Sequence, residues 1–193
     1  MRVPELIAYQ SRRYAAEYVE FVREAFDRSG SSAITAAVAR QLHYLMAYKD
    51  EYEVARLHLA HLPSEGRFWF HLHPPLLRAL GMKRKLKLGR WFVPFLRLLR
   101  AMRRLRGTAL DPFGHTKVRR VERALVGEYR ELVRGALDEL RPGTEQLVLE
   151  LCELPDSIRG YEEIKLRSVV RFRKDAARLQ RRLERAAPAA LAA

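Results

Sequence analysis

The longest regular pattern in this sequence is a run of apolar residues that recur every three or four positions. Its members are Ile34, Val38, Leu42, Leu45, Tyr48, Tyr52, Ala55 and Leu59. This spacing places all of them on one face of an α-helix, because a helix completes a turn in about 3.6 residues. We therefore predict one long helix over residues 34–59, with its apolar face packed against other helices.

Four further stretches carry the same spacing and are separated by helix-breaking residues. They cover residues 6–26, 118–140, 144–152 and 166–183. Together with a basic stretch described below, they predict a mainly α-helical, compact domain of five or six helices. A chain of 193 residues with 48% hydrophobic content suits one folded unit. We predict a single helical domain over residues 1–186 and a flexible tail over residues 187–193.

One short region departs from the helical pattern. Residues 68–72 are rich in aromatic side chains, and the Pro74–Pro75 pair that follows them is incompatible with a continuing helix. We predict that residues 68–72 are extended and pair with residues 85–88 as a small two-stranded β-ribbon.

The charge of the chain is concentrated in one window. The formal net charge is +14, and no acidic residue occurs between Glu65 and Asp111. Twelve basic residues lie in that window: Arg67, Arg78, Lys83, Arg84, Lys85, Lys87, Arg90, Arg97, Arg100, Arg103, Arg104 and Arg106. Such a local field attracts an anionic partner. Nucleic acid is not favoured, because no zinc-finger or aromatic RNA-binding signature accompanies the charge.

Residues 91–106 of this window are predicted to form an amphipathic helix. Trp91, Phe95, Leu98, Met102 and Leu105 recur on one side, and arginines occupy the other. We interpret this stretch as a helix that packs its apolar side and leaves its arginines in water. An anionic membrane surface or a partner protein are the alternatives for the apolar side.

Several classes of cofactor site are not supported by the sequence. The single cysteine, Cys152, cannot form a disulfide framework or a four-cysteine cluster site within this chain. None of the ten glycines lies in a GxGxxG or GxxxxGK[ST] pattern. His58, His61, His71 and His73 are surrounded by cations that oppose a metal ion, so no metal site is predicted. With no signal peptide and no apolar spanning stretch, the chain is expected to be cytoplasmic.

The sequence LRGTALDPFGHT (residues 105–116) places Asp111 and His115 four positions apart between two helical stretches. A carboxylate and an imidazole at that spacing suggest acid–base chemistry. However, Asp111-Pro112 and the nearby glycines have the composition of a turn, and Thr116 can cap the following helix. We predict a corner between helices rather than a catalytic site.

Four phrases of the sequence carry a resemblance to a known family. They are LMAYKDEYEVARL (residues 45–57), FHLHPPLL (70–77), LRGTALDPFGHTKVRRVERALVGEY (105–129) and LPDSIRGY (154–161). In order and approximate spacing, they resemble the C-terminal domain of the long, fused indolepyruvate ferredoxin oxidoreductases. The pattern departs at residues 159–165, where RGYEEIK stands in place of a sequence like RGFGHVK, and at His73, where a small residue is more usual.

The resemblance implies a part of an enzyme that oxidatively decarboxylates aryl pyruvates to acyl-coenzyme A and reduces ferredoxin. It also implies that thiamine diphosphate, magnesium and the iron–sulfur clusters belong to partner domains or subunits, and that this chain has no catalytic centre of its own. The chain is then a piece of a longer protein, the product of a split gene or a stand-alone relative. A stand-alone basic module that binds nucleic acid or an anionic membrane is the alternative.

We predict an interaction surface for the catalytic domains and ferredoxin. Its basic cluster is the predicted docking face for ferredoxin, and contact with the catalytic domains or simple exposure to water are the alternatives. The surface comprises Lys83, Arg84, Lys85, Lys87 and Arg90 from the basic window, Arg106 and Asp111 around the predicted corner, and Arg159 from the last phrase.

Overall fold

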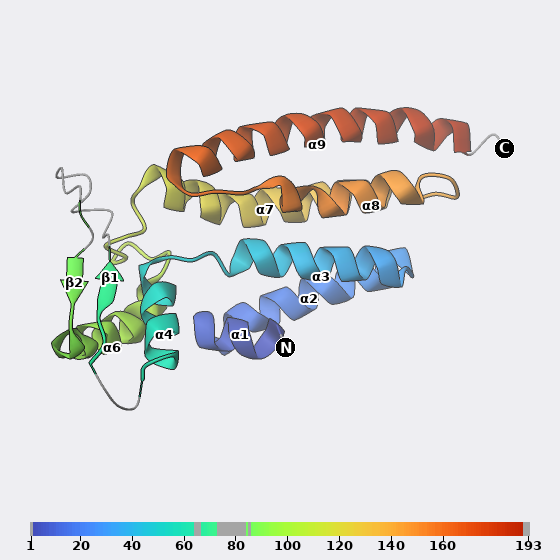
Figure 1. Ribbon diagram of the computed structural model, residues 1–193. Coiled ribbons are helices and arrows are strands. Elements are labelled where there is room, and N and C mark those ends of the chain that lie inside the picture. Colours follow the sequence, from blue (N-terminus) through green and yellow to red (C-terminus); the bar gives the residue numbers. More distant parts are fainter. Residues whose placement is uncertain (1, 64–66, 73–83, 85, 191–193) are drawn as a thin grey trace. The chain divides into compact units, whose positions relative to one another are not determined.

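In the computed structural model, residues 2–63, 67–72, 84 and 86–190 are described (Figure 1). The chain divides into two units, one formed by residues 1–48 and 107–193 and the other by residues 49–106. Each unit has its own cluster of buried apolar side chains. The sequence prediction of one domain over residues 1–186 did not separate them, because no glycine- or proline-rich linker marks the boundary at Tyr48–Lys49.

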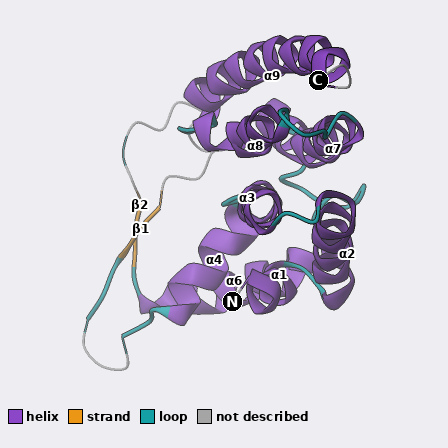
Figure 2. Ribbon diagram, turned by 90° about the vertical axis from the view of Figure 1, so that its right-hand side faces the viewer, coloured by secondary structure: helices purple, strands orange, loops and turns teal. Residues whose placement is uncertain are grey.

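The first unit is built from six α-helices among its described residues. They are α1 (Arg2–Tyr9), α2 (Arg12–Ser29), α3 (Ser32–Met46), α7 (Lys117–Asp138), α8 (Glu145–Glu153) and α9 (Glu162–Ala190). A 3₁₀ turn, η3 (Leu154–Ser157), follows α8. Within this unit, α9 covers α7 and α8, and these two pack on α3, which packs on α2 (Figures 1 and 2). This unit confirms the prediction of a mainly α-helical fold.

The core of this unit is assembled from the apolar stripes that the sequence predicted. Leu42 from α3, Tyr129 and Val133 from α7, and Leu151 from α8 are fully buried in one cluster. The Tyr129 hydroxyl donates a hydrogen bond of 2.7 Å to the carbonyl oxygen of Cys152. A buried hydroxyl needs such a partner, so the packing of α7 on α8 also satisfies the polar group that it buries.

Two predicted helices are each divided in the structure. The stretch over residues 6–26 separates into α1 and α2, because the Ser11 side chain accepts a hydrogen bond from the Tyr14 backbone nitrogen and caps α2. The helix predicted over residues 34–59 ends at Met46 as α3, and a new helix begins at Glu51. The described residues therefore hold eight α-helices instead of the predicted five or six.

Hydrogen bonds account for the end of α3. The last carbonyl groups of a helix lack intrahelical partners. The Tyr14 hydroxyl donates to the carbonyl oxygen of Met46, and the Tyr9 hydroxyl donates to that of Tyr48, each at 3.0 Å. Asp50 then caps the next helix by accepting a hydrogen bond of 2.9 Å from the Glu53 backbone nitrogen. The chain therefore turns between these residues although its apolar periodicity continues.

The second unit, residues 49–106, holds two α-helices and a β-ribbon among its described residues. Its elements are α4 (Glu51–Ala60), β1 (Phe70–Leu72), β2 (Leu86–Leu88), η1 (Arg90–Phe92), α6 (Val93–Ala101) and η2 (Met102–Leu105). The strands pair antiparallel, with Phe70 opposite Leu88 and Leu72 opposite Leu86, which confirms the predicted ribbon (Figure 1). A small core of Ala55, Phe70, Val93 and Leu96 joins α4, β1 and α6.

At the C-terminus, α9 continues to Ala190, so residues 187–190 are helical although the sequence predicted a flexible tail from residue 187. Residues 191–193 lie outside the described residues. None of the helices in the described part of the chain is both long and apolar enough to cross a membrane.

Candidate interaction surface

The predicted corner is organised by the carboxylate of Asp111, which is 3% exposed. Its two oxygens accept hydrogen bonds from the backbone nitrogen of Gly107 at 2.9 Å and from that of Phe113 at 3.1 Å. Gly107 has a φ of +78°, a conformation that favours glycine. The turn composition thus predicted the geometry correctly. Asp111 was also placed on the candidate interaction surface, and this is wrong because its carboxylate is buried against the backbone.

Close packing around Gly114 completes this corner. A Cβ atom on Gly114 would lie 2.6 Å from the Asp111 Oδ2 atom and 2.9 Å from the Arg123 Nη1 atom. Arg123 also donates a hydrogen bond of 2.7 Å to the Gly114 carbonyl oxygen. Thr116 caps α7 as predicted, and His115 is exposed. The arrangement is that of a structural turn, in which the aspartate serves the loop backbone.

Arg106 belongs to a buried ion pair rather than to the surface. Its guanidinium donates hydrogen bonds from Nε and Nη2 to the two carboxylate oxygens of Asp50, at 2.5 and 2.8 Å. Both side chains are 3% exposed, and the guanidinium also lies 5.4 Å from the centre of the Tyr52 ring. The prediction that Arg106 is available to a partner is therefore wrong, because an acidic residue far away in the sequence neutralises it.

The remaining predicted surface residues are divided between the two units. Arg159 belongs to the first unit, where it pairs with Asp156 at 2.5 Å and lies over the Tyr44 ring. Arg84, Lys87 and Arg90 are exposed in the second unit. Lys83 and Lys85 lie outside the described residues. Among the predicted residues described in the second unit, the exposed part of the surface is therefore Arg84, Lys87 and Arg90.

Both tryptophans of the chain lie beside these cations. Trp69 is 50% exposed and Trp91 is 70% exposed. A Cβ atom on Gly89 would lie 3.1 Å from the Trp69 ring and 3.4 Å from the Trp91 ring, so the two indoles flank this glycine closely. Lys87 lies over the Trp69 ring, 4.7 Å from its centre. We call Trp69, Gly89 and Trp91 the tryptophan ridge.

Helix α6 continues the exposed apolar surface. Phe95 and Leu98 are three positions apart, so they share one face of the helix, and both are exposed. The ring of Phe92 links Trp91 to Phe95, with centre-to-centre distances of 5.7 and 4.8 Å. The sequence analysis predicted that Trp91, Phe95 and Leu98 pack inside. That prediction is wrong, because the other side of α6, with Val93 and Leu96, is buried instead.

Arginines accompany this apolar face. Those of α6 and η2 that are exposed to solvent are Arg97, Arg100 and Arg104. The sequence around them contains no carboxylate between Glu65 and Asp111, so no neighbour in the sequence offsets their charge. The second unit thus presents exposed aromatic and aliphatic side chains together with exposed cations.

Fluorescence quenching provides a direct test of this surface. We expect iodide to quench the tryptophan emission strongly and caesium to quench it less, because both indoles are exposed and the cations beside them concentrate anions. The difference between the two ions should shrink in high salt and in the urea-unfolded chain. Weak quenching by both ions in the folded chain would show that the tryptophans are covered.

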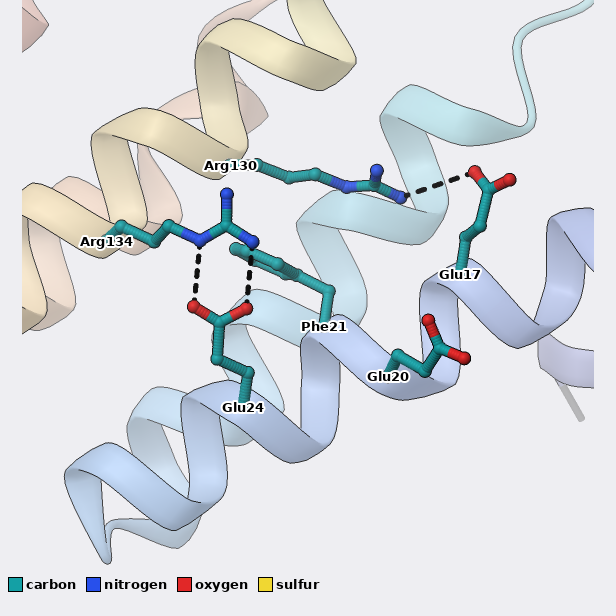
Figure 3. A pocket seen from close by; sticks show the side chains of 6 residues that line it. All are labelled: Glu17, Glu20, Phe21, Glu24, Arg130 and Arg134. Carbon is teal, nitrogen blue, oxygen red and sulfur yellow. Dashed lines mark hydrogen bonds and ion pairs between the residues drawn. The ribbon is translucent and has the colours of Figure 1, made fainter.

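A hollow of about 170 Å³ lies between α2 and α7 (Figure 3). Arg134 donates two hydrogen bonds to Glu24, at 2.8 and 2.9 Å, and these lower the pKa of the Glu24 carboxyl. Arg130 faces Glu17 at 4.0 Å, and both guanidiniums lie over the Phe21 ring. The charges that line this hollow therefore join α2 to α7.

The cysteine and the histidines do not form a reactive or metal-binding cluster in the described structure. Burial raises the pKa of the Cys152 thiol to about 12, which keeps it protonated and unreactive. No group of three or more possible metal ligands occurs among the described residues. Burial lowers the pKa of His58, which lies edge-on to the Phe70 ring. His73 lies outside the described residues.

Comparison with protein families gives a match over most of the chain. The model of a family of unknown function, DUF6537, matches residues 1–178. No curated protein and no solved structure matches the chain.

Proposed function

The chain belongs to the DUF6537 family, whose function is unknown, and from its own residues we propose that it is a non-catalytic interaction domain of a 2-oxoacid:ferredoxin oxidoreductase of the indolepyruvate type. The observation that carries this proposal is the exposed basic surface of the second unit, with Arg84, Lys87 and Arg90. Such a surface attracts an acidic protein and accelerates its association. The resemblance of the four sequence phrases provides the class of enzyme.

The buried acidic and basic side chains are bonded within the protein, and this supports a binding role over a catalytic one. Asp50 and Arg106 neutralise each other inside the second unit, and Asp111 is occupied by the backbone of its own loop. Of the two groups that the sequence offered for acid–base chemistry, the Asp111 carboxylate is thus engaged in structure, whereas His115 is exposed. Catalysis requires a nucleophile or base within reach of substrate, and these buried groups do not meet that requirement.

The proposed division of labour follows from the resemblance. Thiamine diphosphate, magnesium and the iron–sulfur clusters are held by partner domains or subunits, which decarboxylate the aryl pyruvate and form acyl-coenzyme A. The present chain docks on those domains in the cytoplasm, and its basic surface also offers a contact to ferredoxin. Interaction of exposed charges is screened over about 8 Å in physiological salt, so this surface acts mainly on association rates.

A binding and activity experiment tests the proposal. The purified chain should show no turnover with indolepyruvate, coenzyme A, thiamine diphosphate and ferredoxin, yet should bind the catalytic subunits of such an enzyme. Replacing Arg84, Lys87 and Arg90 by glutamate should slow association about tenfold at low ionic strength, since steering of this kind changes on-rates by factors of 10 or more.

A matched control is available on α9, where Arg171, Lys174 and Arg181 are also exposed. Reversing these three changes the net charge equally, so it separates a local effect from a general one. Turnover by the isolated chain, or equal association of both triple variants, would overturn the proposal. Salt-sensitive binding to nucleic acid without binding to the catalytic subunits would favour the alternative of a nucleic-acid module.

A further inference from the structure

We infer that the tryptophan ridge and the exposed face of α6 form the docking site for an acidic protein surface with an apolar centre. This inference rests on the proposed function and names the partner more closely: the surface belongs to the catalytic domains and not to ferredoxin. The residues that carry it are Trp69, Trp91, Phe95 and Leu98, with the arginines around them.

The second unit exposes large apolar side chains next to the ones that it buries. Helix α6 already buries Val93 and Leu96 against α4 and β1. On the same helix Phe95 and Leu98 remain exposed, and Trp91 is more exposed than either. Contiguous exposed apolar residues surrounded by charge are characteristic of binding surfaces, whereas isolated ones are not.

Base stacking is disfavoured at two of the aromatic rings, Trp69 and Phe68, because cations lie over them. A nucleic acid would stack its bases on exposed ring faces. Lys87 lies over the Trp69 ring at 4.7 Å, and Arg90 lies over the Phe68 ring at 5.7 Å. One face of each of these two rings is therefore occupied by a cation, and the cations remain exposed for contact with carboxylates. The arrangement favours an acidic protein over a nucleic acid.

The type of cation at this site, arginine or lysine, also indicates the kind of partner. From η1 to Arg106 every basic residue is an arginine, and Lys87 of β2 is the lysine described beside them. Arginine, tryptophan and phenylalanine are enriched in protein interfaces, whereas lysine is depleted there. A guanidinium also forms two parallel hydrogen bonds with a carboxylate, which an ammonium group cannot do. These residues indicate carboxylates of a protein rather than a membrane, for which lysine serves equally well.

The apolar side chains distinguish between the two proposed partners of this surface, the catalytic domains and ferredoxin. Electron-transfer encounters are small, short-lived and steered by charge. The four large apolar side chains found here are more typical of a lasting contact, in which tryptophan and arginine provide most of the binding energy. The apolar centre therefore fits a stable surface of the catalytic domains.

Alanine substitution of the α6 face tests this site. The variant Trp91→Ala/Phe95→Ala/Leu98→Ala should bind the catalytic subunits at least tenfold more weakly than the unaltered chain, because truncated anchors dominate the loss of affinity. Its circular dichroism spectrum should be unchanged, since all three side chains are exposed. The matched control is Phe26→Ala/Tyr161→Ala/Val170→Ala, which removes exposed apolar side chains of the first unit and should bind normally.

The outcomes separate the inference from the proposed function. If the unaltered chain does not bind the catalytic subunits, the proposed function fails and the site falls with it. If the unaltered chain binds and the α6 variant binds equally well, the site alone is wrong. Sedimentation with vesicles of phosphatidylserine and phosphatidylcholine provides a second arm. If the unaltered chain binds the vesicles and the α6 variant does not, this face binds a membrane and the inference of a protein partner is wrong.

Discussion

Replacing Arg106 by methionine is expected to destabilise the unit formed by residues 49–106 by about 3–5 kcal/mol. The substitution keeps the aliphatic stem but removes the guanidinium that faces both oxygens of Asp50. A buried charge that loses its partner is far more costly than the pair itself is stabilising, because the carboxylate stays desolvated without compensation. The ion pair joins the two ends of this unit, because Asp50 is its second residue and Arg106 is its last.

Hydrogen–deuterium exchange followed by mass spectrometry measures this effect in each unit separately. Peptides from α4 and α6 should exchange much faster in the Arg106→Met variant, while peptides from α3 and α8 should change little. Because the two units have separate cores, one global unfolding free energy would not describe the change.

A double-mutant cycle provides the control. Asp50→Asn keeps a side chain that caps α4 well, so it removes the charge without removing the cap. The double variant Asp50→Asn/Arg106→Met should be less destabilised than the sum of the single variants, because neither charge is left alone. A loss below about 1 kcal/mol for Arg106→Met would show that the pair is solvated rather than buried.

This pair also shows where prediction from the sequence reached its limit. The partner of Arg106 lies 56 positions earlier in the chain, and no local pattern links the two. The absence of acidic residues between Glu65 and Asp111 therefore suggested an exposed cation. By contrast, Asp111 contacts backbone groups within four residues, so the turn composition was sufficient to predict its corner.

Helix α6 illustrates a second limit. Its apolar residues occupy more than one side: Phe95 and Leu98 make one row, which Trp91 of η1 extends, and Val93 and Leu96 make another. Periodicity identifies a helix, but it does not decide which of two apolar rows is buried. That choice depends on Ala55 and Phe70, which pack against Val93 and Leu96 from elsewhere in the unit.

The break between α3 and α4 was, in contrast, marked in the sequence. Asp50 followed three positions later by Glu53 is a helix-start signature, in which an acidic side chain caps the first turn. The continuing apolar period over residues 34–59 obscured that signal, because the core of the first unit and that of the second use the same spacing. A capping signature inside a long apolar stripe should therefore be given weight as a possible boundary.

Replacing Asp111 by alanine is expected to reduce the stability of the unit formed by residues 1–48 and 107–193 by about 3 kcal/mol. Its carboxylate accepts hydrogen bonds from the Gly107 and Phe113 backbone nitrogens, and each such bond to a charged group contributes about 1.5–3 kcal/mol. Arg123 also lies 4.0 Å from this carboxylate and would lose a counter-charge. Hydrogen–deuterium exchange of peptides from α7 and α8 measures the loss in this unit.

Two companion variants identify the cause of that loss. Gly114→Ala should also destabilise the corner, because its Cβ atom would lie 2.6 Å from the Asp111 Oδ2 atom and force the carboxylate to move. His115→Ala should change stability by no more than about 0.5 kcal/mol, since this imidazole is exposed. The expected loss of stability therefore depends on how closely each residue contacts the loop backbone, and not on whether its side chain can transfer a proton.

The same variants decide between a corner and an acid–base pair. If Asp111 and His115 worked together on a substrate, then His115→Ala and Asp111→Asn would abolish turnover of the complete enzyme while the fold remained stable. A structural corner predicts the opposite for His115→Ala, namely a stable protein with unchanged turnover and unchanged pH dependence. Asp111→Asn should lie between the wild type and Asp111→Ala in stability, because one acceptor oxygen remains for the two backbone nitrogens that the carboxylate now serves.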